Sequence, residues 1–156
     1  MLRPLLLVGL RLGYRLTRAL LKAAGVERPG VHAVPITPDG RVVLVRLTYA
    51  PGWRIPGGGA KKGEAREEGV LRELREEIGL VSWSRIEPLR DLPPQADRAA
   101  EESDFFVLRN VVYEPRRNLE IEEVGAFEPS ALPEEMRPEV RELIAAALAS
   151  RGEPSA

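Results

Sequence analysis

Short runs of β-branched and aromatic residues, separated by turns rich in polar residues, glycine and proline, fill much of the chain after residue 30. The runs VHAVPI (31–36) and RVVLVRL (41–47) flank a Pro38-Asp39-Gly40 turn, which predicts two strands joined by a tight turn. Further strands are predicted at 53–55, within 81–92, at 103–113 and at 123–129. The polar segment 93–103 is predicted to be a loop near a substrate.

Two segments have apolar residues at the spacing of an amphipathic helix. The first, 64–78, precedes Gly79, and glycine commonly terminates helices. The second, 134–149, follows Pro133, which is favoured at the start of a helix. Strands interspersed with two such helices predict an α/β (α+β) fold.

The N-terminal segment 1–26 has the pattern of an amphipathic helix. Leucines and alanines line one face of this helix. Another face carries the central basic residues, which are Arg11, Arg15, Arg18 and Lys22. The uncharged run 4–10 is much shorter than the about 20 apolar residues that span a bilayer. Regularly spaced arginines are also atypical of a signal peptide. We therefore predict a helix packed on the domain or on a second subunit of a homodimer; membrane-surface binding and a cleaved signal are the alternatives.

The chain has 156 residues, 44% hydrophobic and 30% charged, which fits one globular domain. We place this domain at 27–150, before a frayed tail at 151–156. The formal net charge of −1 gives no basic field to attract nucleic acid, so no nucleic-acid partner is expected. The absence of cysteine excludes disulfides and thiolate metal sites, and a cytoplasmic location is expected. The single histidine, His32, lies in an apolar run, where packing or hydrogen bonding is the favoured role.

Three carboxylates in the first predicted helix suggest a metal site. Glu73, Glu76 and Glu77 stand at positions i, i+3 and i+4, which share one helical face. Carboxylate oxygens are hard ligands that suit Mg²⁺, with Mn²⁺ as the alternative. Taken alone, the charges favour an ordinary solvated helix with ion pairs to neighbouring arginines. The glycines at 57–59 favour the metal site, because their backbone can approach a phosphate closely.

The segment GGGAKKGEAREEGVLRELREEIGL (57–80) resembles the Nudix box of the Nudix hydrolase family, G-x5-E-x7-R-E-U-x-E-E-x-G-U with U an aliphatic residue. Every defined position matches: Gly58, Glu64, Arg72, Glu73, Leu74, Glu76, Glu77, Gly79 and Leu80. The resemblance implies a Nudix-like α/β/α sandwich with a mixed central sheet. It also implies that Gly57, Gly58 and Gly59 form the phosphate loop.

The same resemblance implies a role for each box side chain. Glu73, Glu76 and Glu77 would bind the metal, and Glu64 would act as a supporting ligand or acid/base group. Arg72 would orient the carboxylates through ion pairs, and one glutamate would be the general base. These five residues form the expected catalytic set.

Nudix enzymes often take one more carboxylate from a loop before a late strand. Glu120 is the first candidate for this additional metal ligand, and Glu123 is the second. Gly69 is a departure, because family members commonly carry alanine there, and glycine should cost the helix roughly 1 kcal/mol.

The implied activity is Mg²⁺-dependent hydrolysis of the pyrophosphate bond in a nucleoside diphosphate linked to another moiety. Triphosphates, modified triphosphates and nucleotide sugars stay open as substrates. Trp53, Tyr49 and Phe106 could stack on a base, although core packing is favoured for all of them. The alternatives are an idle nucleotide sensor, and a membrane- or partner-binding module that uses the N-terminal helix.

Overall fold

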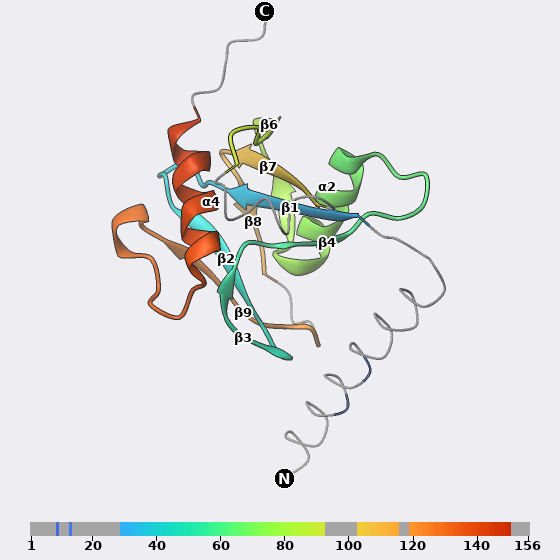
Figure 1. Ribbon diagram of the computed structural model, residues 1–156, viewed down its shortest axis with the longest axis horizontal. Coiled ribbons are helices and arrows are strands. Elements are labelled where there is room, and N and C mark those ends of the chain that lie inside the picture. Colours follow the sequence, from blue (N-terminus) through green and yellow to red (C-terminus); the bar gives the residue numbers. More distant parts are fainter. Residues whose placement is uncertain (1–8, 10–12, 14–28, 93–102, 116–118, 151–156) are drawn as a thin grey trace, which may run out of the picture.

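The computed structural model describes residues 9, 13, 29–92, 103–115 and 119–150 (Figure 1). The predicted N-terminal helix lies outside these residues except for Gly9 and Gly13, which are helical. Residues 93–102 of the predicted loop and the C-terminal tail also lie outside them. The strands are β1 (Gly30–Pro35), β2 (Val42–Leu47), β3 (Ala50–Arg54), β4 (Gly57–Gly59), β5 (Leu80–Ser82), β6 (Arg85–Pro88), β7 (Ser103–Arg109), β8 (Val112–Tyr113) and β9 (Ile121–Phe127). The helices are α2 (Arg66–Glu77), a 3-10 turn η1 (Pro129–Ala131) and α4 (Pro138–Ala149).

A mixed four-stranded sheet has the order β4-β1-β7-β6. Strand β1 is central: it pairs antiparallel with the glycine strand β4 and parallel with β7. Its parallel register joins Gly30 to Ser103 and Pro35 to Leu108. A second, antiparallel sheet has the order β3-β2-β9, and β5 pairs with β8.

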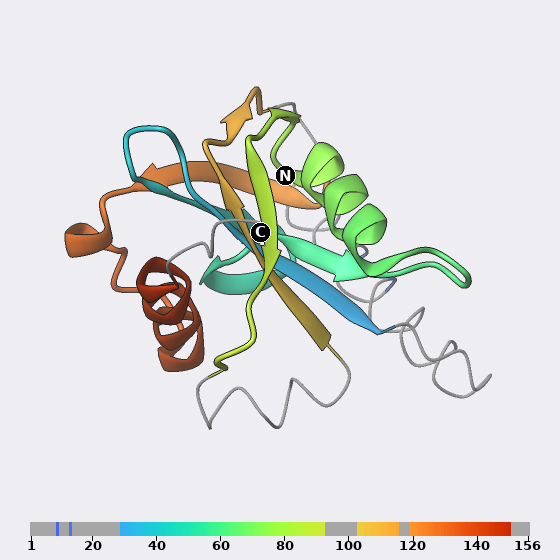
Figure 2. The same ribbon diagram turned by 90° about the horizontal axis from the view of Figure 1, so that it is seen from above.

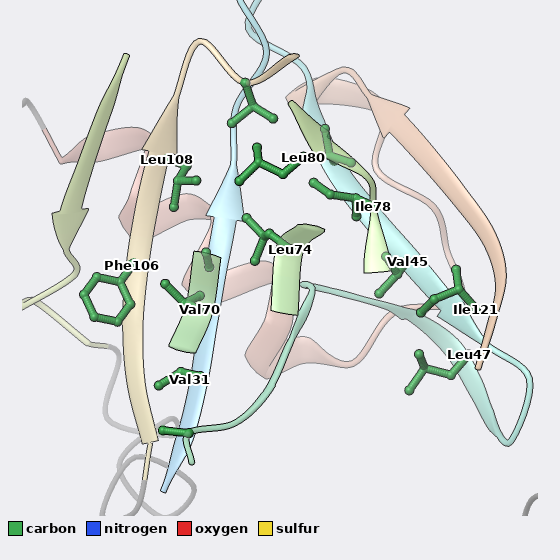
Figure 3. Packing of buried hydrophobic residues seen from close by; sticks show 14 residues of the cluster. Val31, Val45, Leu47, Val70, Leu74, Ile78, Leu80, Phe106, Leu108 and Ile121 are labelled. Carbon is green, nitrogen blue, oxygen red and sulfur yellow. The ribbon is translucent and has the colours of Figure 1, made fainter. Parts of the chain in front are cut away.

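The two helices cover opposite sides of these strands (Figure 2). On the α2 side, Val70, Leu74 and Ile78 pack on a cluster that includes Val31 from β1 and Val45 from β2 (Figure 3). On the α4 side, a second cluster joins helix residues to the alternate positions of the same strands, and it contains Val34, Ile36, Leu44, Leu143, Ile144 and Ala147. Both faces of β1 and β2 are buried, which explains why the sequence segments 31–36 and 41–47 are almost continuously apolar. The predicted α/β/α sandwich with a mixed sheet is confirmed.

Several predicted boundaries were wrong. The glycines 57–59, predicted as a loop, form strand β4, and the strand predicted at 123–129 is β9 (Ile121–Phe127). The strand predicted at 103–113 breaks at Asn110, whose φ of +53° turns the chain between β7 and β8. The C-terminal helix begins at Pro138 rather than at residue 134, because the preceding backbone at Arg137 is extended. The first helix begins at Arg66, so Glu64 lies before it.

The predicted turn between β1 and β2 forms, but the two strands do not pair along their lengths. Gly40 has a φ of +83°, and a single bridge joins Ile36 to Val42. Beyond this bridge β1 enters the four-stranded sheet and β2 enters the three-stranded one. The sheets therefore diverge from this turn.

Gly79, which ends α2, should not tolerate a side chain. Its φ is +70°, and a Cβ there would overlap the carbonyl oxygen of Glu114. We expect Gly79→Ala to lower the free energy of unfolding by about 2–3 kcal/mol in chemical denaturation. Gly63 is the matched control, because its φ is +77° but a Cβ would meet no atom within 4 Å. Gly63→Ala should cost only about 1–2 kcal/mol; equal losses in the two variants would contradict the overlap.

Candidate functional site

The glycine strand β4 lies against the C-terminal half of α2. The Gly57 amide donates a hydrogen bond of 2.8 Å to Oε2 of Glu77, which is the one buried charged side chain among the described residues. At the next position, a Cβ on Gly58 would lie 2.5 Å from Cδ of Glu73. The lack of side chains on β4 therefore lets two carboxylates approach its backbone closely.

Arg72 links the beginning of the helix to this strand. Its Nε donates to Oε1 of Glu64 at 2.8 Å, and its Nη2 donates to Oε2 of Glu64 at 3.1 Å. Its other bonds run from Nη1 to Oε1 of Glu73 at 2.6 Å and from Nη2 to the carbonyl oxygen of Gly59 at 3.0 Å. All three charged side chains are at most 20% exposed. One guanidinium thus fixes the positions of two carboxylates and of the glycine strand.

Gly69 leaves room for this arrangement. A Cβ at Gly69 would lie 3.0 Å from Oε2 of Glu64 and 3.4 Å from Cβ of Ala60. The carboxylate of Glu64 is held in place by Arg72 and by the Lys61 amide, at 2.8 Å from Oε2. The glycine at this helix position therefore avoids a tight contact with Glu64.

The glutamates of the site differ in their proton affinity. Hydrogen bonds from Arg72, followed by that from the Lys61 amide, lower the pKa of Glu64 to about 2. The pKa of Glu77 is raised to about 8, mainly by burial and also by the nearby Glu73 and Glu120 carboxylates, whereas the Gly57 hydrogen bond opposes the shift. Burial also raises the pKa of Glu73, although its bond with Arg72 opposes the shift. The inner carboxylates therefore favour an added positive charge.

Glu76, at 58% side-chain exposure, lies at the outer edge of the site, and its nearest oxygen is 3.6 Å from Nη1 of Arg72. No group of three or more carboxylate or imidazole side chains converges at metal-binding distance within the described part of the chain. Joint ligation by the predicted set therefore requires Glu76 to turn inward toward Glu73.

The two loop candidates lie in different surroundings. The Glu120 carboxylate is close enough to raise the pKa values of both Glu73 and Glu77. Glu123 is opposite Arg46 in the β2–β9 ladder and accepts a bond of 2.8 Å from its Nη2. Arg46 in turn lies over the ring of Trp53, which belongs to the α4-side cluster. The structure thus brings Glu120, and not Glu123, to the site.

The aromatic candidates are mainly core residues. Trp53 is 8% exposed and makes an edge contact with Phe127, with ring centroids 4.8 Å apart. Phe106 is 5% exposed and belongs to the α2-side cluster, against which the half-buried Tyr49 packs. A residue that the sequence pattern does not single out is Arg54, whose charge lowers the pKa of Glu77. Its position one residue from the buried Trp53 on a strand is the signal that places it on the opposite face.

The sequence profile of the NUDIX domain family matches residues 26–147. The chain belongs to the Nudix family. An RNA pyrophosphohydrolase from Hahella chejuensis is 43% identical over 53 residues, which cover 34% of this chain and 33% of that protein. The match thus spans about a third of the length of this curated relative.

Solved Nudix structures share the fold over most of the chain. A MutT Nudix hydrolase from Burkholderia pseudomallei, 27% identical, superposes with a TM-score of 0.60 over 76% of this chain and 96% of that one. An ADP-ribose pyrophosphatase from Streptococcus suis, 24% identical, gives a TM-score of 0.63 over 82% of this chain and 95% of that one. The second likeness concerns the fold alone.

Nudix hydrolases generally depend on a divalent metal ion and act on small nucleotide-type substrates. The residues of this chain fit such an ion, because buried carboxylate oxygens face a strand without side chains. Burial raises the pKa values of Glu73 and Glu77, so their ionised forms are stabilised by an added positive charge. Carboxylate oxygens are hard donors, which suit a hard divalent cation better than a soft one. No helix in the described part of the Nudix chain is long and apolar enough to cross a membrane.

His32 makes the stability of this Nudix domain dependent on pH. Burial, followed by the charge of Arg54, lowers its pKa from 6.5 to about 4, and its ring stacks on Phe105. As pH falls below 6.5 the unfolded chain binds a proton that the folded protein accepts only near pH 4. We therefore expect a progressive loss of stability across this window, reaching about 2–3 kcal/mol. Urea denaturation should show the loss in the wild type relative to His32→Phe; parallel pH profiles would contradict it.

Proposed function

We propose that the protein is a Mg²⁺-dependent hydrolase that cleaves the pyrophosphate bond of a nucleoside diphosphate linked to another moiety. The observation that supports this most directly is the pair of inner carboxylates, Glu73 and Glu77, held against the glycine strand. Ionising both carboxylates of such a largely buried pair is unfavourable unless a cation compensates the charge. A bound divalent cation supplies charge neutralisation on the diphosphate and makes water more acidic.

The side chains of the site have separate proposed roles. Glu73, Glu77 and, after turning inward, Glu76 bind the cation, and Glu120 completes the oxygen ligands. Arg72 orients Glu73 and holds Glu64, and it does not touch the substrate. Glu64 has a pKa near 2 and is a weak base at neutral pH, so we assign it a supporting role. The general base is then one of the glutamates outside the Arg72–Glu64 pair.

The phosphate groups are proposed to lie along β4. The glycines at 57–59 present backbone without side chains, and β4 is at the edge of its sheet in the described part of the chain. Backbone amides there can approach a phosphate closely. Residues of β4 therefore bind the diphosphate of the substrate, and residues outside β4 must bind the groups attached to it.

A substrate screen with Mg²⁺ or Mn²⁺ tests the proposal. The panel contains nucleoside triphosphates, ADP-ribose, other nucleotide sugars and RNA with a 5′-triphosphate, because relatives include RNA and ADP-ribose pyrophosphatases. We expect metal-dependent release of phosphate, pyrophosphate or a nucleoside monophosphate from at least one compound. Binding of nucleotides without turnover across the whole panel would instead favour a nucleotide sensor.

A further inference from the structure

Arg54, at the end of β3, has a largely unpartnered guanidinium whose Nε atom is buried. Its Nε is inaccessible to solvent and has no hydrogen-bond partner. Its one hydrogen bond in the described structure is a long contact of 3.4 Å from Nη2 to the carbonyl oxygen of Pro51. None of the ion pairs between described residues involves Arg54. Leaving a buried charged donor without an acceptor is costly, so a purely structural role does not explain this side chain.

The strand register places Arg54 on the same face as the glutamate site. Arg54 is the partner of Val45 in the β2–β3 ladder, and Val45 belongs to the cluster beneath α2. The chain then continues through Pro56 into β4, where Gly57 bonds Glu77. The charge of Arg54 acts on the carboxyl of Glu77, although the two side chains form no ion pair. A cation therefore lies beside the carboxylates without neutralising them.

Arg46, on the adjacent strand, differs from Arg54 because its guanidinium has a carboxylate partner. Its Nε is also buried without a partner. Its Nη2, however, bonds Glu123 at 2.8 Å, and its guanidinium lies 5.1 Å from the centre of the Trp53 ring. Arg46 faces the α4 side, as does Trp53, its partner in the register. The two arginines thus differ in face and in charge compensation.

We propose that Arg54 binds the substrate directly, with its guanidinium donating to non-bridging oxygens of the diphosphate beside β4. This inference rests on the proposed function, because it names a substrate-binding residue of the same site. A guanidinium offers planar, paired donors that match phosphate oxygens, and an anionic ligand supplies the acceptor that Nε lacks. The metal cation and Arg54 would then contact the diphosphate from different sides. The site would therefore bind compounds with a charged diphosphate in preference to neutral nucleosides.

Calorimetry with α,β-methylene-ADP and Mg²⁺ tests the role of Arg54, because this diphosphate analogue resists cleavage at its bridge. The variants are Arg54→Met, which removes the charge, Arg54→Lys, which keeps a point charge, and the matched control Arg46→Met. We expect about 10- to 100-fold weaker binding by Arg54→Met, an intermediate loss by Arg54→Lys, and binding within about twofold of wild type by Arg46→Met. Adenosine, which has no phosphate, should bind the wild type and Arg54→Met with equal affinity.

Thermal stabilisation by Mg²⁺ without nucleotide separates binding of the diphosphate from binding of the cation. Arg54→Met should keep this stabilisation or increase it, since the substitution removes a positive charge near the carboxylates. The inference is overturned if Arg54→Met binds the analogue as tightly as wild type, or if Arg46→Met loses as much affinity. It is overturned too if wild type binds neither the analogue nor inorganic pyrophosphate. Binding that depends on Arg54 without hydrolysis of any compound would reject the proposed function and leave this inference standing.

Discussion

Glu77→Gln is expected to reduce metal-dependent hydrolysis at least about 100-fold, since even residues that only support metal ligands often cost 10- to 100-fold when replaced. The fold should survive, because the amide oxygen of glutamine can still accept the Gly57 hydrogen bond at this buried position. Thermal unfolding and turnover, measured on the same preparation, check both expectations. Glu68→Gln, an exposed position on the same helix, is the matched control and should change neither.

The same variant has an expected pH signature in metal-free protein. Burial raises the pKa of Glu77 from 4.5 to about 8, so the folded protein binds a proton more readily than the unfolded chain. Stability contributed by this group therefore falls as pH rises from 4.5 to 8. Glu77→Gln should be at least as stable as wild type at pH 8, and Mg²⁺ should stabilise wild type much more than the variant. Full activity in Glu77→Gln, or an equal response to Mg²⁺, would falsify the assigned role.

Arg72→Ala is expected to lower the free energy of unfolding by about 3–5 kcal/mol, the cost of removing one partner from a largely buried ion pair. The substitution leaves Glu64 and Glu73 without their shared guanidinium and removes a bond to the Gly59 carbonyl oxygen. Hydrolysis should fall as well, because Glu73 and β4 lose their common anchor. Denaturant titration and steady-state kinetics measure the two effects.

Two further variants sharpen the test of Arg72. Arg72→Lys should recover only part of the stability, because one ammonium cannot reach the acceptors that Nε, Nη1 and Nη2 contact separately. Among the described residues, Arg75→Ala on the same helix removes a cation–π contact with Trp83 at 5.7 Å and no ion pair, so it should cost about 1 kcal/mol or less. A loss in Arg75→Ala as large as in Arg72→Ala would mean that the helix, rather than the ion-pair network, is responsible.

The sequence predicts the shared helical face of Glu73, Glu76 and Glu77, because helix geometry alone determines that spacing. It cannot predict that Glu77 is buried while Glu76 is exposed, since that difference depends on where β4 lies against the helix. The three glycines at 57–59 indicate that another group approaches their backbone closely, but the sequence does not identify that group. Only the packed structure shows that the partners are the Glu77 carboxylate and the side chain of Glu73.

The choice between Glu120 and Glu123 shows a second limit. In a regular strand, residues two apart share a face, so the buried Ile121 would place Glu123 on its own side. The β2–β9 register shifts, however, so that Leu47 is opposite Ile121 while Arg46 is opposite Glu123. One residue of β9 is thus extra, and Glu123 faces away from the site. Such a bulge depends on the pairing of distant strands and leaves no local signature in the sequence.

The order in which parts of the site occur along the chain has a consequence for folding kinetics. Gly57, Arg72 and Glu77 belong to one short stretch, so their contacts require little loop closure. The neighbouring β1 is held by parallel pairing of Gly30 with Ser103, and Glu120 comes from the segment before β9, which pairs with β2. Non-local pairing of this kind forms slowly. Weak cation affinity should thus develop early in refolding, and full affinity only after β7 and β9 are in place.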